Sequence, residues 1–252
     1  MPAVSLLAPE LVSIAPVLAR ADDGERLAAA SDLVRHPRQM LRLGRTLRDL
    51  PVVEVTLTDS VSGREIEAAV MHRRFRVPTG RVARATLEIP TDASAYTRGR
   101  HRQAMRTNLA RARSSGITTS VVTPDELGAL PEAATRPAWR AHLMWVQRTF
   151  QPYDASEAVI LVAWDAECRP LAVIGAILDV DVALLKAHVS DGDGTGRSEA
   201  RYLLMGALVT ALAERGCRLL LSDSALTLPR GVAYFQHLAG FAPRNLRLTR
   251  NG

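Results

Sequence analysis

The sequence is poor in cysteine, in aromatic residues and in lysine. Its two cysteines, Cys168 and Cys217, lie far apart, and neither has a histidine or cysteine neighbour at metal-ligand spacing. This scarcity excludes a disulfide framework and gives no indication of a zinc site. It is typical of a protein from a reducing compartment, so we expect a cytoplasmic protein without a bound metal.

Long uncharged apolar runs are also missing. The amino-terminal run AVSLLAPELVSIAPVLAR has no basic leader, and it contains Glu10 and interior prolines. It therefore predicts a packing segment and not a signal peptide. Since nothing approaches the apolar length that a bilayer requires, we expect no membrane span.

Basic residues are plentiful, but nearly all of them are arginines. Of the 32 basic residues only Lys186 is lysine, which leaves 31 arginines, and the formal net charge is +6. A positive net charge favours an anionic partner without saying anything about fold. The arginine bias can also reflect a genome rich in G and C. At 252 residues with 47% hydrophobic composition, the chain suffices for one large domain or two small ones.

The clearest functional pattern is the segment AYTRGRHRQAMRTNLARARSSGI at residues 95–117. At about 100° per residue, Arg102, Arg106 and Arg113 fall on one helical stripe. The apolar stripe beside it consists of Met105, Leu109 and Ala112. Arginine stays charged and binds phosphate bidentately, so the pattern indicates a helix that contacts an RNA backbone or a phosphorylated cofactor. The alternative is an ordinary solvated helix.

A second basic face precedes this segment. Apolar residues recur at intervals of three and four between residues 9 and 50, which predicts short helices. The arginines of the second of these helices follow at helical intervals and are Arg35, Arg38, Arg42, Arg45 and Arg48.

Strand and helix patterns predict an α/β fold. Strands are expected at residues 52–57, 64–74, 83–89, 117–122, 158–163, 171–178, 182–189, 219–221 and 245–248, with a hairpin turn at 59–63. Helices are expected from residue 124, at 131–150, at 200–215 ending at Gly216, and at 232–238 ending at Gly240. Residues 91–252 are therefore predicted to form a mixed sheet flanked by helices, with a reduced α+β portion at 1–90.

The strand at 182–189 carries the lysine. A period of two puts Val182, Leu184, Lys186 and His188 on one face, so Lys186 and His188 are expected to be neighbours. Burying an unpaired lysine is costly, so Lys186 must reach solvent or serve a partner. Its two interpretations are an active-site group and a lysine that extends to solvent at the sheet edge.

The glycine-rich loop at 191–196 lies between a strand and a helix N-terminus, where backbone amides commonly bind phosphate. Asp191 and Asp193 would repel an anion, however. A calcium loop is less favoured, because its twelfth position is Tyr202 where a glutamate is needed. A flexible polar connection is the favoured interpretation.

Polar residues gather near the carboxyl-terminal end of the chain. The segment GVAYFQHLAGF places Tyr234, Gln236 and His237 on a short helix, after a strand that ends at Ser222-Asp223-Ser224. Polar groups at the carboxyl end of a strand often line a cleft. Gln236 could donate to a developing oxyanion, and Asp223 or His237 could move a proton. No serine, histidine and aspartate set has a diagnostic motif, so a hydrolase is not supported.

Three segments together resemble the acyltransferase half of Fem-type (FemABX-like) proteins, the GNAT-like enzymes that transfer an amino acid from aminoacyl-tRNA to an amine. They are YTRGRHRQAMRTNLARARSSGI, ARYLLMGALVTALAERGCRLLLSD and GVAYFQHLAGFAPR. The resemblance implies a GNAT-type sheet, a cleft where neighbouring strands splay apart, and an acyl donor. The chain departs from it at Gln236, where members commonly have lysine. It also has Asp191 where coenzyme A-binding relatives have Arg or Gln, which favours tRNA as donor.

These patterns lead to the hypothesis of a cytoplasmic aminoacyl-tRNA-dependent N-acyltransferase that acts on an amine, such as that of a small metabolite, and needs no bound cofactor. The residues expected at the reaction centre are Lys186, His188, Asp223 and Gln236. Those expected to contact tRNA or substrate are Arg98, Arg102, Arg106, Arg113 and Tyr234. Two alternatives remain open. One is an acyltransferase that uses acyl-CoA or a carrier protein, and the other is a non-catalytic RNA-binding protein on a transferase fold.

Overall fold

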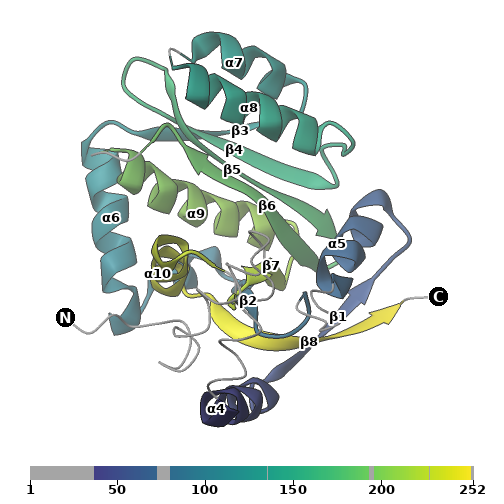
Figure 1. Ribbon diagram of the computed structural model, residues 1–252. Coiled ribbons are helices and arrows are strands. Elements are labelled where there is room, and N and C mark those ends of the chain that lie inside the picture. The colour runs from purple at the N-terminus through teal and green to yellow at the C-terminus, as the bar shows by residue number, and fades with distance from the viewer. Residues whose placement is uncertain (1–36, 73–79, 135, 193–195, 227, 251–252) are drawn as a thin grey trace. The chain divides into compact units, whose positions relative to one another are not determined.

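The computed structural model describes residues 37–72, 80–134, 136–192, 196–226 and 228–250 (Figure 1). The expected mixed α/β architecture is confirmed. The helices are α4 (Pro37–Arg48), α5 (Val61–Met71), α6 (Gln103–Ser114), α7 (Leu130–Ala133), α8 (Pro137–Phe150), α9 (Arg197–Glu214) and α10 (Arg230–Ala239). The strands are β1 (Val52–Leu57), β2 (Arg84–Glu88), β3 (Thr118–Val122), β4 (Ala158–Trp164), β5 (Pro170–Asp179), β6 (Val182–Ser190), β7 (Leu219–Ser224) and β8 (Ala242–Arg250).

The chain divides into two compact units that are both discontinuous in sequence. Among the described residues, the smaller unit takes 37–56, 67–72, 80–87, 222–226 and 228–249, and the larger takes 57–66, 88–134, 136–192, 196–221 and residue 250. The elements α5 and β7 each contribute to both units. The sequence, in contrast, predicted a single boundary after residue 90.

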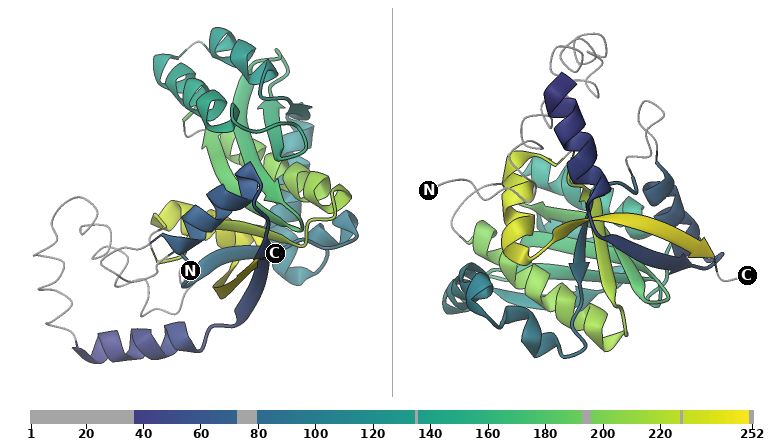
Figure 2. Two further views of the ribbon diagram at one scale, coloured as in Figure 1. Left: turned by 90° about the vertical axis from the view of Figure 1, so that its right-hand side faces the viewer. Right: turned by 90° about the horizontal axis from the view of Figure 1, so that it is seen from below.

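The larger unit is built on strands ordered β3-β4-β5-β6-β7. Pairing is antiparallel from β3 to β6 and parallel between β6 and β7. Strands β4 and β5 are almost wholly buried, which explains their unbroken apolar runs. Helix α9 lies against one side of these strands and α8 against the other (Figures 1 and 2). A Cβ atom at Gly175 would collide with the Phe150 ring of α8, so this glycine permits the close contact.

Helix α6 packs by the predicted apolar stripe. Met105, Leu109 and Ala112 are all buried, and Leu109 contacts Gly206 of α9. The helix ends at Ser114, and Gly116 follows with φ of 71° before strand β3 begins. The helix is shorter than the pattern suggested, because residues 93–97 and 100–102 form separate 3₁₀ turns.

The smaller unit contains the order β1-β8-β2, and β7 follows β2. Strands β2 and β8 are antiparallel, with Thr86 opposite Ala242. Asn245 of β8 ties this unit together, because its side chain accepts from the backbone N–H of Ala83 at 3.1 Å and donates to the carbonyl of Leu47 at 2.7 Å.

The predicted hairpin at 59–63 and strand at 64–74 are wrong, because this segment begins helix α5. Ser60 caps the helix by accepting the backbone N–H of Gly63 at 2.8 Å. Asp179, at the end of β5, accepts from the Thr58 hydroxyl at 2.6 Å and from the Ser60 hydroxyl at 2.9 Å. A carboxylate 119 residues away thus helps fix the start of the helix, and no local pattern reveals it.

Candidate active site

Strand β6 is irregular at the lysine. It pairs with β5 along its whole length, but its ladder with β7 covers only Val182–Leu184. On the β5 side, Ala187 lies opposite Gly175 and Leu185 lies opposite Ala176, so Lys186 is an extra residue, a β-bulge. A bulge bends its strand and redirects a side chain, and bulges are frequent next to active sites.

This bulge overturns the prediction that Val182, Leu184, Lys186 and His188 share one face. Residues directly opposite in an antiparallel pair point to the same side, and Leu184 is opposite Ile177 whereas His188 is opposite Ile174. Odd and even positions of β5 face opposite ways. His188 therefore lies on the other face from Leu184, and Lys186 and His188 reach different partners.

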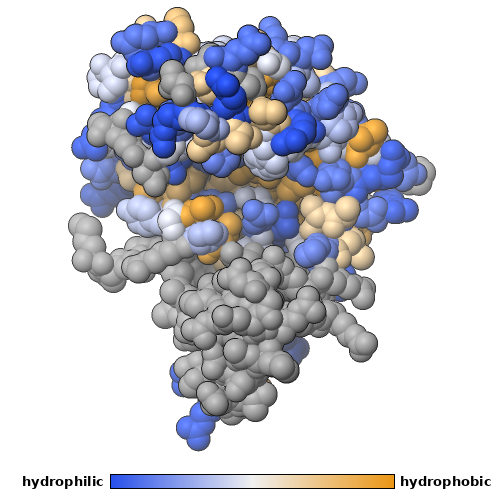
Figure 3. All heavy atoms as spheres, turned by 45° about the horizontal axis from the view of Figure 1, so that its top comes forward, coloured by the Kyte–Doolittle hydropathy of each residue, from blue (hydrophilic) through white to orange (hydrophobic). Residues whose placement is uncertain are grey.

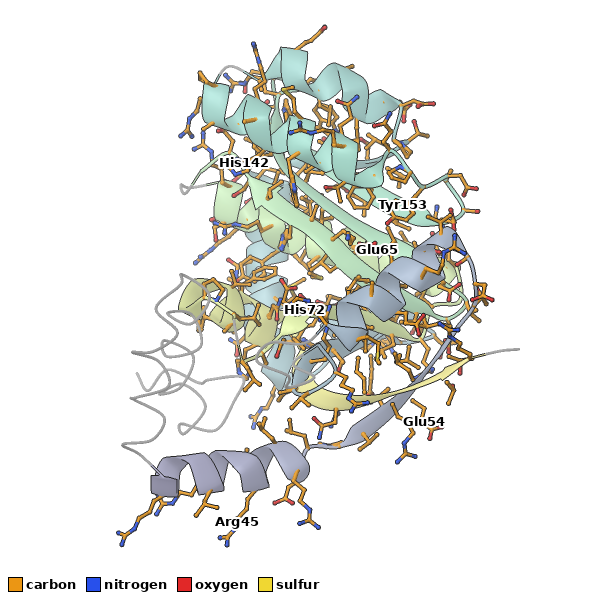
Figure 4. All side chains as sticks on the ribbon, turned by 45° about the vertical axis from the view of Figure 1, so that its right-hand side comes forward. Arg45, Glu54, Glu65, His72, His142 and Tyr153 are labelled. Atoms are coloured by element: carbon orange, nitrogen blue, oxygen red, sulfur yellow. The ribbon has the colours of Figure 1, made fainter. Side chains whose placement is uncertain are left out.

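Lys186 is paired with an acid from helix α5. Its Nζ donates to Oε1 of Glu65 at 2.5 Å, and the lysine side chain is 23% exposed. Tyr153, which follows α8, lies near Glu65 (Figure 4). Burial raises the pKa of Tyr153 to about 12, with further contributions from the negative charges of Glu65 and Glu157. The bulge thus presents an ammonium group to a carboxylate beside a buried phenol.

The amino-terminal part of α5 is held in place by a second acid. Glu157, just before β4, accepts from the backbone N–H of Ser62 at 3.3 Å and from its hydroxyl at 3.1 Å. Together with the bonds to Asp179, these contacts fix the helix turn from which Glu65 extends. Glu65 is therefore presented to Lys186 by a fixed scaffold.

His188 lies on the face of the strand covered by α9. Burial lowers its pKa to about 4, and the positive charge of Arg201 on α9 lowers it further. The imidazole is consequently uncharged at neutral pH. It can accept a proton, although its low pKa makes it a weak base.

The N-terminus of α9 already carries carboxylates of the chain itself. Glu199 accepts the backbone N–H of Gly196 at 2.7 Å. Asp191 forms ion pairs with Arg136 at 3.0 Å and with Arg197 at 3.4 Å. The middle of this loop, residues 193–195, lies outside the described residues. In the described part, the Gly196 N–H is thus bonded by a carboxylate of the chain, and Asp191 is paired with two arginines.

In the smaller unit, the structure separates Gln236 from Asp223. Gln236 of α10 is buried and donates to the Ser222 hydroxyl at 2.7 Å, and its Oε1 has no hydrogen-bond partner among the described residues. Asp223 follows Ser222 on β7, so it points to the opposite face, where it is exposed. There its charge acts on buried Arg84, whose pKa is lowered by burial and partly restored by Asp223. Tyr234 is 54% exposed on α10.

Two of the expected phosphate-binding arginines are engaged by the chain. Arg106 donates to the carbonyls of Thr97 at 2.8 Å and Gly99 at 2.6 Å. Arg102 precedes α6, and its guanidinium lies 5.0 Å from the centre of the Tyr96 ring. These two groups are therefore not held out together as the helical stripe suggested.

The other two arginines of this set differ from each other. Arg98 donates to the Ser94 hydroxyl at 2.6 Å and lies 3.3 Å from the Asp92 carboxylate. Arg113 is exposed near the end of α6, as is Arg111. Of the four, Arg113 is thus the most available for an external anion.

Sequence reasoning missed Glu65, Tyr153 and Arg84. Glu65 lies in the segment that was mistaken for a strand, and its partner Lys186 is 121 residues away. The one local signal was the rarity of lysine, which singled out Lys186 but not its partner.

Within the described residues, no cluster of three or more histidine, cysteine, aspartate or glutamate side chains has the arrangement of a metal site. None of the helices that the structure describes has the length and hydropathy of a membrane span. On the face shown in Figure 3, hydrophilic side chains predominate and hydrophobic ones form separate groups.

Comparison with known proteins assigns no family. No family model and no curated protein matches the chain. Among solved structures, a Bacteroides thetaiotaomicron protein of unknown function gives a TM-score of 0.47 at 12% identity, covering 63% of this chain and 55% of that one. The C-terminal domain of a putative lysylphosphatidylglycerol synthetase from Agrobacterium fabrum gives 0.40 at 14% identity, covering 64% and 57%. A tandem GNAT protein from the clavulanic acid biosynthesis pathway gives 0.36 at 18% identity, covering 52% and 43%.

The chain thus spans about half the length of these proteins. Likeness at this level carries no activity over to the present chain. Its class is a mixed α/β protein with a bulged central strand.

Proposed function

We propose that the chain is an acyltransferase that transfers an aminoacyl group from tRNA to an amine and forms an amide bond. The observation that carries the proposal is the β-bulge of β6, which presents the one lysine of the sequence to Glu65. The resemblance of three segments to Fem-type enzymes supports the choice of reaction. The net charge of +6 is consistent with an RNA donor.

The chemistry requires few groups. The acceptor nitrogen attacks the ester carbonyl of aminoacyl-tRNA, the C–N bond forms, and the bond to the ribose oxygen breaks. One proton passes from the nitrogen to the ribose oxygen, so atoms and charge balance. The ester is already activated, so positioning, an oxyanion donor and a proton acceptor suffice.

The candidate residues differ in how well they suit the roles of oxyanion donor and proton acceptor. In this proposal the Lys186 ammonium, oriented by Glu65, stabilises the oxyanion. His188 is uncharged at neutral pH but faces α9, so it is a weak candidate for the proton acceptor. Gln236 and Asp223 belong to the smaller unit and lie on opposite sides of β7, so the proposal gives neither of them a role at the Lys186 site. The buried Oε1 of Gln236 has no hydrogen-bond partner among the described residues, and such a group costs free energy, so Gln236 is the better candidate of the two for contact with a ligand in the smaller unit.

Acyl-CoA is the weaker choice of donor. In coenzyme A-dependent transferases of the resembled superfamily the pyrophosphate binds at a loop before a helix. Here the corresponding helix N-terminus is capped by Glu199, with Asp191 close by in the same loop. The Gly196 N–H, which a phosphate would otherwise accept from, is therefore already bonded within the chain.

The test follows label from tRNA to product. Purified protein is mixed with tRNA charged with radiolabelled amino acids and with a panel of small amines. We expect amine-dependent loss of label from tRNA together with a new amide. Replacing one transition-state donor costs about 100- to 1,000-fold in rate, so Lys186→Ala should fall in that range. Arg148→Ala, an exposed change on α8, is the matched control and should retain full rate.

Three outcomes would overturn the proposal. Charged tRNA that stays intact while acetyl-CoA is consumed would identify a thioester donor. Tight tRNA binding without turnover on any amine would identify an RNA-binding protein. Turnover that is unchanged in Lys186→Ala would show that the lysine at the bulge has no role in the reaction.

A further inference from the structure

Helix α4 carries a second arginine surface, which we call the α4 arginine face. It consists of Arg38, Arg42, Arg45 and Arg48. All four are exposed, and the helix contains no acidic residue. At about 100° per residue, Arg38, Arg42 and Arg45 lie within an arc of about 60°. Figure 4 shows Arg45 directed outward from the helix.

The spacing of the four guanidinium groups suits a polyanion with several phosphate groups. A rise of about 1.5 Å per residue separates Arg38 from Arg45 by about 10 Å along the axis. Several phosphates of one nucleic-acid strand can be contacted over such a span, each of them by a bidentate arginine. A single small anion could be bound by all four guanidinium groups only if they pointed toward one position.

The helix is anchored at its carboxyl-terminal end. Asn245 of β8 donates to the Leu47 carbonyl at 2.7 Å, and the backbone N–H of Asp49 donates to the Arg45 carbonyl at 2.9 Å. Helix α4 therefore presents its arginines from the fixed frame of the smaller unit. A Cβ atom at Gly44 would meet no atom within 4 Å among the described residues.

The arginines around α6 and those of α4 differ in how far other groups of the chain engage them, and this difference favours α4 as the phosphate-binding surface. Around α6, Arg106 is bound to two backbone carbonyls, Arg102 lies over Tyr96, and Arg98 is paired with Asp92. Arg111 and Arg113 are exposed, so α6 offers two uncommitted guanidinium groups where α4 offers four. On α4 the four exposed guanidinium groups have no side-chain partner within the part of the chain that the structure describes, and a polyanion would relieve their mutual repulsion.

RNA fits this face better than a lipid bilayer. A helix that lies in a membrane interface needs a broad apolar face. Among the side chains of α4 that the structure describes, which do not include Met40 and Leu43, four exposed ones are arginines and one, Leu41 at 67% exposed, is a large apolar group. Arginine in place of lysine also favours bidentate phosphate contacts.

We propose that the α4 arginine face binds RNA phosphates and is the main contact for tRNA, in place of α6. The identity of the RNA as tRNA rests on the proposed function, whereas the phosphate contact does not.

The experiment measures binding of fluorescently labelled, uncharged tRNA at several salt concentrations. The variants are Arg42→Gln/Arg45→Gln on α4 and Arg111→Gln/Arg113→Gln on α6, which remove the same charge. Each lost phosphate contact reduces the slope of log affinity against log salt by about 0.7 to 0.9. We expect the α4 pair to lower the slope by about 1.5 and the affinity about 10-fold or more at low salt. The α6 pair should change affinity less than about twofold.

Further controls keep the test decisive. Circular dichroism checks that each variant is folded, and Arg148→Gln on α8 measures the effect of losing one positive charge at a site outside both helices. A larger loss with the α6 pair than with the α4 pair would overturn the inference. So would binding of vesicles containing phosphatidylglycerol without binding of tRNA.

This assay is independent of turnover, so the two proposals fail separately. If no amine is acylated but the α4 pair still weakens tRNA binding, the proposed function falls and the inference stands. If turnover occurs and its KM for charged tRNA is unchanged in the α4 pair, the inference falls and the proposed function stands.

Discussion

The most direct prediction concerns the effect of acid on His188. Its pKa is lowered from 6.5 to about 4 in the folded chain, first by burial and then by the charge of Arg201. Between these two values the unfolded chain binds a proton at this site and the folded chain does not. Stability is therefore fully present above pH 6.5 and is lost progressively as the pH falls towards 4.

The size of the effect follows from the shift. One pKa unit corresponds to about 1.4 kcal/mol, so the full contribution of His188 is about 3 kcal/mol, of which about 2 kcal/mol is lost between pH 7.5 and pH 5. Urea unfolding at these two pH values should show this loss for the native sequence. His188→Gln, which cannot titrate, should lose about 2 kcal/mol less over the same interval.

Two further measurements make the prediction refutable. His142→Gln, a change at an exposed histidine of α8, should leave the pH dependence of the native protein intact. The ring resonances of His188 in an NMR titration should stay unchanged down to about pH 5. A midpoint near 6.5, or equal acid losses in the native protein and His188→Gln, would show that the imidazole is not held neutral by its surroundings.

Three other substitutions test the packing and hydrogen bonding. Gly175→Ala should lower the free energy of unfolding by about 1 to 3 kcal/mol, because the new Cβ collides with Phe150; an unchanged urea midpoint would contradict this contact. Asp179→Ala removes the acceptor for three donors at the start of α5 and should cost about 3 kcal/mol, with faster amide exchange in residues 61–66 and not in α9. Ser222→Ala leaves the Gln236 amide without its acceptor and should cost about 1 to 3 kcal/mol by thermal unfolding, whereas Ser222→Thr should restore most of it.

Local periodicity correctly predicted those elements whose conformation depends least on residues distant in the sequence. The stripe Met105, Leu109 and Ala112 is buried because a helix repeats every 3.6 residues wherever it packs. Helix α9 ends just before Gly216, which has φ of 73°, and α10 ends at Gly240 in the left-handed region. Glycine adopts the left-handed conformation at a helix end without steric cost. These helix ends could therefore be predicted without knowledge of the tertiary structure.

The candidate site was harder to predict, because its geometry depends on partners distant in sequence. Lys186 was singled out by its rarity, yet the bulge that presents it exists only in the register with Gly175 and Ala176 on β5. One inserted residue reverses the face of every position after it, which is why His188 was misplaced.

The sequence alone determined that the chain forms mixed α/β structure, that α6 packs by one apolar stripe, and that the surface is rich in arginine. Only the tertiary structure decided that residues 61–71 form a helix, that Glu65 pairs with Lys186, and that Arg106 is bound to carbonyls whereas the arginines of α4 are exposed. Periodicity and glycine conformation are properties of a short segment. Charge pairing, burial and strand register are instead set by groups that folding brings together, and those properties determine what a charged side chain can bind.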